Sequence, residues 1–128
     1  MGSIFQVKGT VYRNDSADVR LAVKDTETGV LVQRADLVRI GCRLERILPS
    51  PQVVANWSIS VEDSISDGPI FQQQDPGWHY TDEGYNFFWA LERGYLDKAP
   101  AQYRLIFEFE LTGLRKGTHV VDLDVLAP

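Results

Sequence analysis

The residues best suited to acid–base chemistry are crowded into one polar stretch near the middle of the chain. Asp75, His79, Asp82 and Glu83 follow one another closely there. A hydrolase needs a general acid and a general base within reach of one pocket, and these side chains could supply both. Acidic residues in a turn-rich loop more often form a solvated face. We therefore expect a protein that is not an enzyme and has no catalytic residue.

A second candidate for chemistry is the segment DSISDG (63–68), which begins like a calcium-binding loop. Such a loop needs oxygen ligands at fixed spacing, but Ile65 stands at the third ligand position and Gln74 where the closing glutamate should be. The two histidines, His79 and His119, lack the spacing of a zinc site. We therefore expect no metal ion and no cofactor.

The elements that must position any site are predicted to be β-strands, because apolar and polar residues alternate in several segments. Turn-forming Gly, Asn, Asp, Ser and Pro separate these segments, and none has a convincing helical period. The pattern predicts an all-β fold, a single antiparallel β-sandwich of about eight strands, with one domain over residues 1–128. The residues expected to face the core are Val19, Leu21, Val23, Val38, Ile40, Cys42, Leu44, Trp57, Ile59, Val61, Tyr103, Leu105, Phe107, Phe109, Leu111, Val121, Leu123 and Val125.

The segment APAQYRLIF (99–107) indicates an immunoglobulin-like (Ig-like) form of the sandwich. Ala101 and Tyr103 stand where an Ig-like strand carries a small residue and then a tyrosine whose hydroxyl bonds back to the chain upstream. Ala99 replaces the acid expected there, and Leu105 stands where antibody domains have cysteine. An ordinary buried tyrosine at the start of a strand remains the alternative interpretation.

Charge and cysteine content exclude several classes of partner. The net charge is −5 and the pI about 4.9, whereas a nucleic-acid-binding protein needs a basic face. No apolar run approaches the length of a membrane span, and the first residues do not form a secretory signal. The single cysteine, Cys42, cannot form an internal disulfide, which fits either a reducing compartment or a fold that needs no disulfide. We expect no nucleic acid and no membrane among the partners.

The aromatic segment QDPGWHYTDEGYNFFWALERGYL (74–96) is predicted to be divided between core and surface. Phe87, Trp89 and Leu91 follow the alternation of the core strands. Phe88, between Asn86 and Ala90, would then face away from the core. An outward-facing apolar patch usually marks a contact with a partner. The residues predicted to form such an interface are Trp78, Tyr80, Tyr85, Phe88, Tyr95 and, on the neighbouring candidate strand, Ile106.

The same aromatic residues allow a second interpretation. β-Sandwich modules often present Trp and Tyr as flat platforms on which sugars stack. Trp78, Tyr80 and Tyr85 lie on a predicted loop and could form one. A carbohydrate-binding module is therefore the alternative hypothesis.

The layout of segment 11–45 resembles the opening of Ig-like β-sandwich domains found in phage virion proteins. The resemblance is carried by Tyr12, the Asn14–Asp15 turn, the alternating strand Val19, Leu21 and Val23, the turn from Asp25 to Gly29, and the strand through Val38 and Ile40. Such domains occur as N-terminal domains of baseplate proteins and as capsid decoration (cement) proteins. The second half of the chain is also similar, but the long aromatic loop at 73–85 is a departure.

The resemblance implies a structural role in a virion. A baseplate protein is normally longer, so a free-standing sandwich is more similar to a decoration protein. The implied partners are other virion proteins, the major capsid protein above all, and further copies of the chain itself. The implied location is the virion, assembled in the host cytoplasm.

Overall fold

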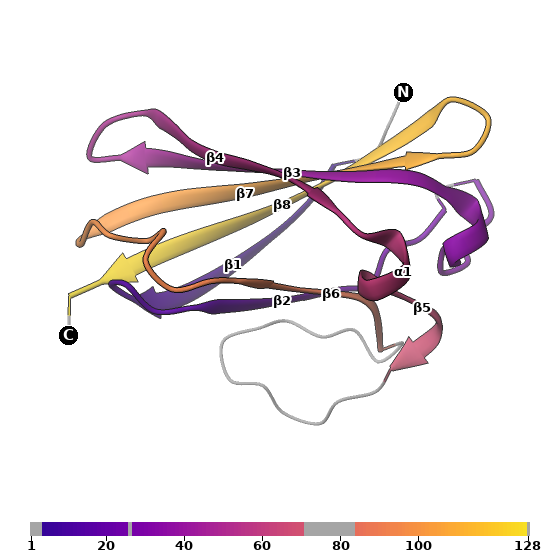
Figure 1. The fold of residues 1–128 in the computed structure, drawn as a ribbon, viewed down its shortest axis with the longest axis horizontal. Helices are drawn as coiled ribbons and strands as arrows, with labels where there is room; N and C mark the ends of the chain where they lie inside the picture. Colours follow the sequence, from indigo (N-terminus) through magenta and orange to yellow (C-terminus); the bar gives the residue numbers. More distant parts are fainter. Residues whose placement is uncertain (1–3, 26, 71–83, 128) are drawn as a thin grey trace.

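Eight strands of the described chain form two sheets that pack face to face (Figure 1), which confirms the all-β sandwich. The structure, a computed structural model, describes residues 4–25, 27–70 and 84–127. The strands are β1 (Ile4–Tyr12), β2 (Ala17–Leu21), β3 (Leu37–Leu48), β4 (Gln52–Ile59), β5 (Ile65–Ile70), β6 (Tyr85–Leu91), β7 (Ala101–Leu111) and β8 (Arg115–Leu126). Two helical turns accompany them, η1 (Arg34–Asp36) before β3 and α1 (Val61–Ser64) after β4.

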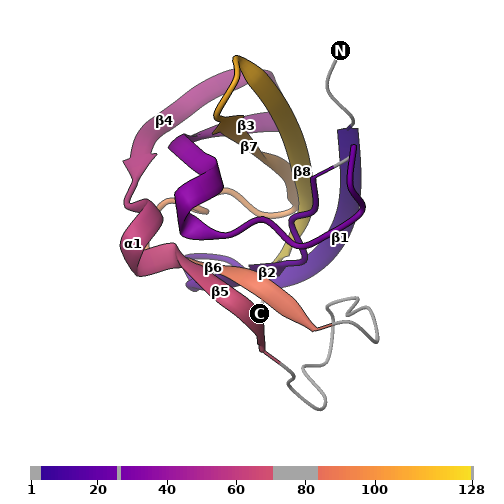
Figure 2. The same cartoon turned by 90° about the vertical axis from the view of Figure 1, so that its right-hand side faces the viewer.

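The strand order is that of an Ig-like sandwich. One sheet has the order β1-β8-β7-β3-β4 and the other β2-β6-β5, as the two layers in Figure 2 show. In an Ig-like domain with strands lettered A to G, strands B, E and D lie in one sheet and strands C, F and G in the other. Here β2, β6 and β5 correspond to B, E and D, and β3, β7 and β8 correspond to C, F and G, with β4 as an additional strand beside β3. The prediction of an antiparallel sandwich needs one correction, because β1 pairs with β8 in parallel.

The core lies between the two sheets and contains nearly all of the predicted inward-facing residues. Phe87 from one sheet meets Phe107 and Phe109 from the other, with ring centroids 5.2 Å apart in both pairs. Trp57 and Val61 are partly buried and pack against this core. Because the inward-facing residues Leu105, Phe107 and Phe109 of β7 are fully buried, this strand forms the middle of the core wall.

Val38 is the one predicted core residue that faces solvent, with 60% of its surface exposed. Leu37 takes its place in the core. The pairing of β3 with β7 shifts between Leu37 and Arg39, so that two residues of β3 stand opposite one of β7. Such a bulge reverses the inside–outside alternation at that point. The prediction that Val38 faces the core was therefore wrong, because the bulge shifts the alternation by one residue.

Tyr103 has the hydroxyl contacts that the Ig-like interpretation predicts. Its ring is fully buried at the start of β7. The hydroxyl accepts a hydrogen bond from the Lys98 backbone N–H at 3.2 Å and donates one to Asp97 Oδ1 at 3.1 Å. The connection between β6 and β7 is thereby held against the strand that follows it, which is the role of a corner tyrosine.

Asn86 is buried, although the alternation of β6 places it on the outer side with Phe88. Its Oδ1 accepts a hydrogen bond from the Val23 N–H at 2.7 Å. Its Nδ2 donates to the carbonyl oxygens of Val23 at 3.1 Å and Val32 at 2.9 Å. Asn86 therefore fastens the long connection between β2 and β3 to the three-stranded sheet, and it satisfies polar backbone groups that are shielded from water.

Candidate contact surface

Two of the predicted interface residues, Tyr85 and Phe88, lie together on the three-stranded sheet. Arg20 stands directly opposite Phe88 in the pairing of β2 with β6. Its guanidinium carbon lies 4.9 Å from the centroid of the Phe88 ring and 5.8 Å from that of Tyr85. Both distances are in the range of a cation–π contact. We call these three residues the Arg20 cluster.

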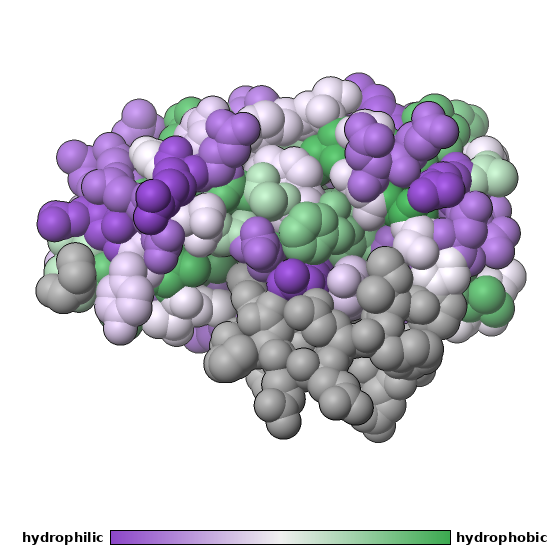
Figure 3. Space-filling model, turned by 60° about the horizontal axis from the view of Figure 1, so that its bottom comes forward, coloured by the Kyte–Doolittle hydropathy of each residue, from purple (hydrophilic) through white to green (hydrophobic). Residues whose placement is uncertain are grey.

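The exposure of the Arg20 cluster suits a protein contact. Phe88 keeps 37% of its surface exposed, while the side chain of Arg20 is only 13% exposed. The guanidinium is thus already largely removed from water before any partner arrives, and Asp18 lies 3.8 Å from it. Figure 3 shows this side of the molecule, where apolar surface lies among hydrophilic side chains. Aromatic side chains and arginine are the usual anchors of protein interfaces.

Ile106 does not belong to the same surface, and the prediction of one patch with Phe88 was wrong. The two residues lie on different sheets, because the connection between β6 and β7 crosses the sandwich. The inner sides of these strands face each other, with the rings of Trp89 and Phe107 5.7 Å apart. Ile106 is half-buried on the outer side of the five-stranded sheet.

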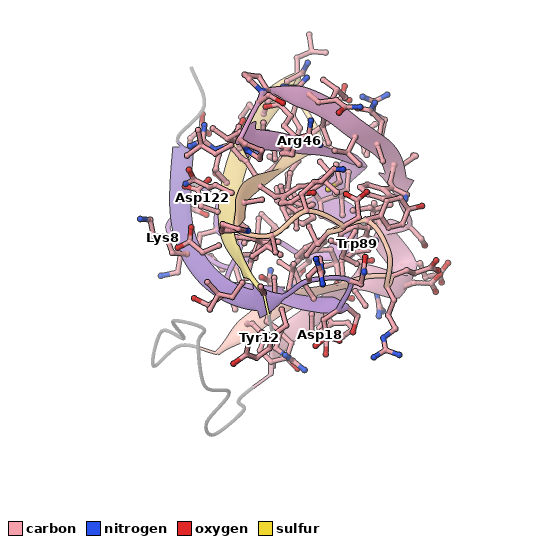
Figure 4. The ribbon with its side chains drawn as sticks, turned by 90° about the vertical axis from the view of Figure 1, so that its left-hand side faces the viewer. Lys8, Tyr12, Asp18, Arg46, Trp89 and Asp122 are labelled. Carbon is pink, nitrogen blue, oxygen red and sulfur yellow. The ribbon has the colours of Figure 1, made fainter. Side chains whose placement is uncertain are left out.

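Tyr95 packs at the flank of the core. Its ring meets that of Trp57 at 5.1 Å, and Trp57 meets Trp89 at the same distance, both edge to face. These half-buried aromatic rings close the side of the sandwich between β4 and β6, and Figure 4 shows Trp89 between the two sheets. Large aromatic residues in this arrangement contribute mainly to stability. Tyr95 is therefore placed with the core.

The remaining predicted residues lie outside the described part of the chain. Trp78 and Tyr80, which enter both the interface hypothesis and the sugar-platform hypothesis, are among them. So are the residues considered for acid–base chemistry, Asp75, His79, Asp82 and Glu83.

The outer side of the five-stranded sheet is a mixed-charge surface around a shallow hollow. The hollow has a volume of about 260 Å³ and lies over Gly41, between Ile106 and Asn56. Ion pairs surround the hollow. Because the charges of opposite sign are neighbours, neither sign dominates the electrostatic potential on this surface. Their separations are 3.6 Å for Arg39–Glu110, 3.0 Å for Arg43–Glu45, 3.5 Å for Lys116–Glu108 and 2.8 Å for Arg104–Asp122.

The segment 63–68 does not form a calcium-type loop. Asp63 lies in α1, whose first turn is capped by Ser60, and Ile65 is buried in β5. Asp67 accepts a hydrogen bond from the Arg34 backbone N–H at 2.7 Å. Across the residues that the structure describes, no group of three or more His, Cys, Asp or Glu side chains could hold a metal ion.

Two groups that could react in other proteins are buried in the core here. Burial raises the pKa of the Cys42 thiol to about 12, so that the nucleophilic thiolate is disfavoured at neutral pH. Burial lowers the pKa of His119 to about 4, and its ring packs edge to face on Phe109 at 5.3 Å. Both residues are structural in this environment. Within the described chain, no helix has the length and apolar character to cross a membrane.

The buried neutral His119 predicts acid sensitivity. Its pKa lies below the ordinary value of 6.5, so below that pH the unfolded chain binds a proton that the folded chain refuses. The free energy of unfolding should therefore fall by about 2 kcal/mol between pH 7 and pH 5. Urea unfolding at the two pH values measures this loss. In His119→Phe the free energy of unfolding should change much less with pH, whereas His79→Gln should behave like the wild type. An unchanged pH dependence in His119→Phe would contradict the assignment of this effect to His119.

No family model matches the chain, and no curated protein matches its sequence.

Proposed function

We propose that the chain is a non-enzymatic structural protein that works through protein–protein contacts, as a decoration protein on a phage capsid. The observation that carries the contact role is the Arg20 cluster. It combines a partly exposed phenylalanine with a tyrosine and a largely desolvated arginine on a paired sheet. Side chains held by strands are already ordered, so a partner loses little conformational entropy on docking against them.

The capsid assignment is supported by the resemblance of segment 11–45 to Ig-like domains of virion proteins. It also fits the physical demands on a cement protein. Such a protein strengthens a shell through many copies, each of which adds a modest contact area across the joints. The Ig-like sandwich supplies the rigid body that this role needs. Trp78 and Tyr80 stay in the proposal on the strength of the sequence alone.

The test is co-sedimentation of the purified protein with undecorated shells from its source. Phe88→Ala removes the exposed ring of the Arg20 cluster and should weaken binding by about tenfold or more, because truncating an aromatic anchor costs about 2 kcal/mol. Val38→Ala is the matched control. It removes an exposed apolar side chain from the other sheet and should leave binding unchanged.

Equal binding by wild type and Phe88→Ala, with equal stability, would remove the Arg20 cluster from the interface. Tight binding of a free oligosaccharide that Trp78→Ala or Tyr85→Ala abolishes would favour the carbohydrate-binding hypothesis instead.

A further inference from the structure

A two-layer sandwich has open sheet edges, and β4 forms one of them. It is the terminal strand of the five-stranded sheet and pairs only with β3 among the described residues. Figure 2 shows it at the free side of the sheet, with α1 directly beyond its end. Alternate backbone N–H and C=O groups of such a strand point away from the sheet and can pair with another chain.

β4 lacks the charged and proline residues that commonly protect an edge strand. The other edge strands carry them: β1 contains Lys8, β2 contains Asp18 and Arg20, and β5 contains Asp67 and Pro69. The sequence of β4, QVVANWSI, has neither a charged residue nor a proline. This edge is therefore the one best suited to accept a further strand.

The geometry of β4 defines which part can pair. Its register with β3 shifts at Val54, so a bulge interrupts the strand near the hairpin. From Ala55 to Ile59 it follows β3 residue by residue. The available edge is thus a regular stretch centred on Trp57.

The two ends of β4 are flanked by opposite charges, which lie on the neighbouring elements β3 and α1. Arg46, at the hairpin end, donates hydrogen bonds to the side chains of Ser50 at 3.1 Å and Gln52 at 2.9 Å. Glu62 and Asp63 lie in the exposed first turn of α1, at the other end. Within the described residues, neither Arg46 nor these two acids has a salt-bridge partner. Figure 4 looks onto the hairpin end, with Arg46 labelled.

We infer that β4 pairs antiparallel with β4 of a second copy of this chain, so that the two five-stranded sheets become continuous. A two-fold axis at Trp57 places Ala55 opposite the second copy's Ile59. The hairpin end of each copy, with Arg46, then faces the α1 end of the other copy, with Glu62 and Asp63. The symmetry repeats this attraction at both ends, and the uncharged stretch between them places no like charges opposite each other.

A second copy fits this edge because the opposite charges flank the two ends of the same uncharged strand. A two-fold interface uses the same surface on both partners, so the basic end must meet the acidic end and the middle must match itself. β4 satisfies both conditions. The β4 edge is a different surface from the Arg20 cluster, and pairing there does not depend on the nature of the shell.

The first measurement is sedimentation of the purified protein over a concentration series that reaches the millimolar range. The wild type should form a dimer. Ser58→Lys places a cation on the paired stretch, where Gly41 beside it leaves room, and should weaken the dimer by about tenfold or more. Leu114→Lys makes the same change of charge at an exposed position in the turn between β7 and β8, outside this edge, and should leave the dimer intact.

Exchanging the charges at the two ends of β4 tests whether the hairpin end of one copy meets the α1 end of the other. Arg46→Glu alone should weaken the dimer, and combining it with Glu62→Arg and Asp63→Arg should restore it. A wild type that stays monomeric throughout the series would overturn the proposal, as would equal dimerisation of Ser58→Lys and Leu114→Lys at equal stability. Growth into open fibres would also overturn it, because a two-fold pair is closed.

Discussion

Replacing Phe107 with alanine is expected to lower the free energy of unfolding by about 3–5 kcal/mol. The ring is fully buried at the centre of the core. It lies 5.2 Å from Phe87, 5.7 Å from Trp89 and 6.5 Å from Phe109. Truncation removes contacts to both sheets and leaves a cavity that the paired strands around it cannot easily close. Urea unfolding of the two proteins measures the difference.

The matched control is Phe88→Ala, which makes the same chemical change at an outward-facing position of β6, in the other sheet. Phe88 is partly exposed, so its loss should cost about 1 kcal/mol or less, mostly through the contact with Arg20. Equal losses in the two variants would contradict the placement of Phe107 at the centre of the core.

Asn86→Ala is expected to cost about 3–4 kcal/mol, an unusually large effect for a polar residue. The substitution removes the hydrogen-bond partners of the Val23 N–H and the Val32 C=O, and both groups are shielded from water. Each buried group left without a partner costs about 1–3 kcal/mol. Val23 C=O keeps its bond from the Val32 N–H, at 2.9 Å.

Asn56→Ala provides the comparison, because Asn56 lies exposed on β4. At protein concentrations below those needed for the proposed pairing of β4, this variant should lose about 0.5 kcal/mol or less. Hydrogen exchange adds a local test. The Val23 amide should lose protection in Asn86→Ala, and an unchanged rate there would show that Asn86 does not hold this segment.

Alternation predicted the fold because most strands have one buried and one solvated face. In β7, the buried residues from Tyr103 to Leu111 alternate without interruption, and the sequence shows this directly. For Tyr103 the sequence left two interpretations open, a corner tyrosine and an ordinary buried tyrosine, and the hydroxyl contacts to Lys98 and Asp97 favour the first.

The failures have physical causes that the sequence does not display. A bulge turned Val38 outward, and nothing in the local residue pattern marks a shift of register. Phe88 and Ile106 were expected on one surface because β6 and β7 follow each other, but the chain changes sheets between them. Asn86 looked like a surface residue, since only the folded chain brings Val23 and Val32 to it. Arg20 was not among the predicted interface residues, because the two rings that it contacts, those of Tyr85 and Phe88, lie on another strand.

Electron cryo-microscopy of native particles from the source tests the proposed role most directly. The account predicts copies of the sandwich on the shell surface, with the outer side of the three-stranded sheet against the shell and Phe88 buried at the contact. Particles that lack this density, or that carry the sandwich with Phe88 facing solvent, would contradict it.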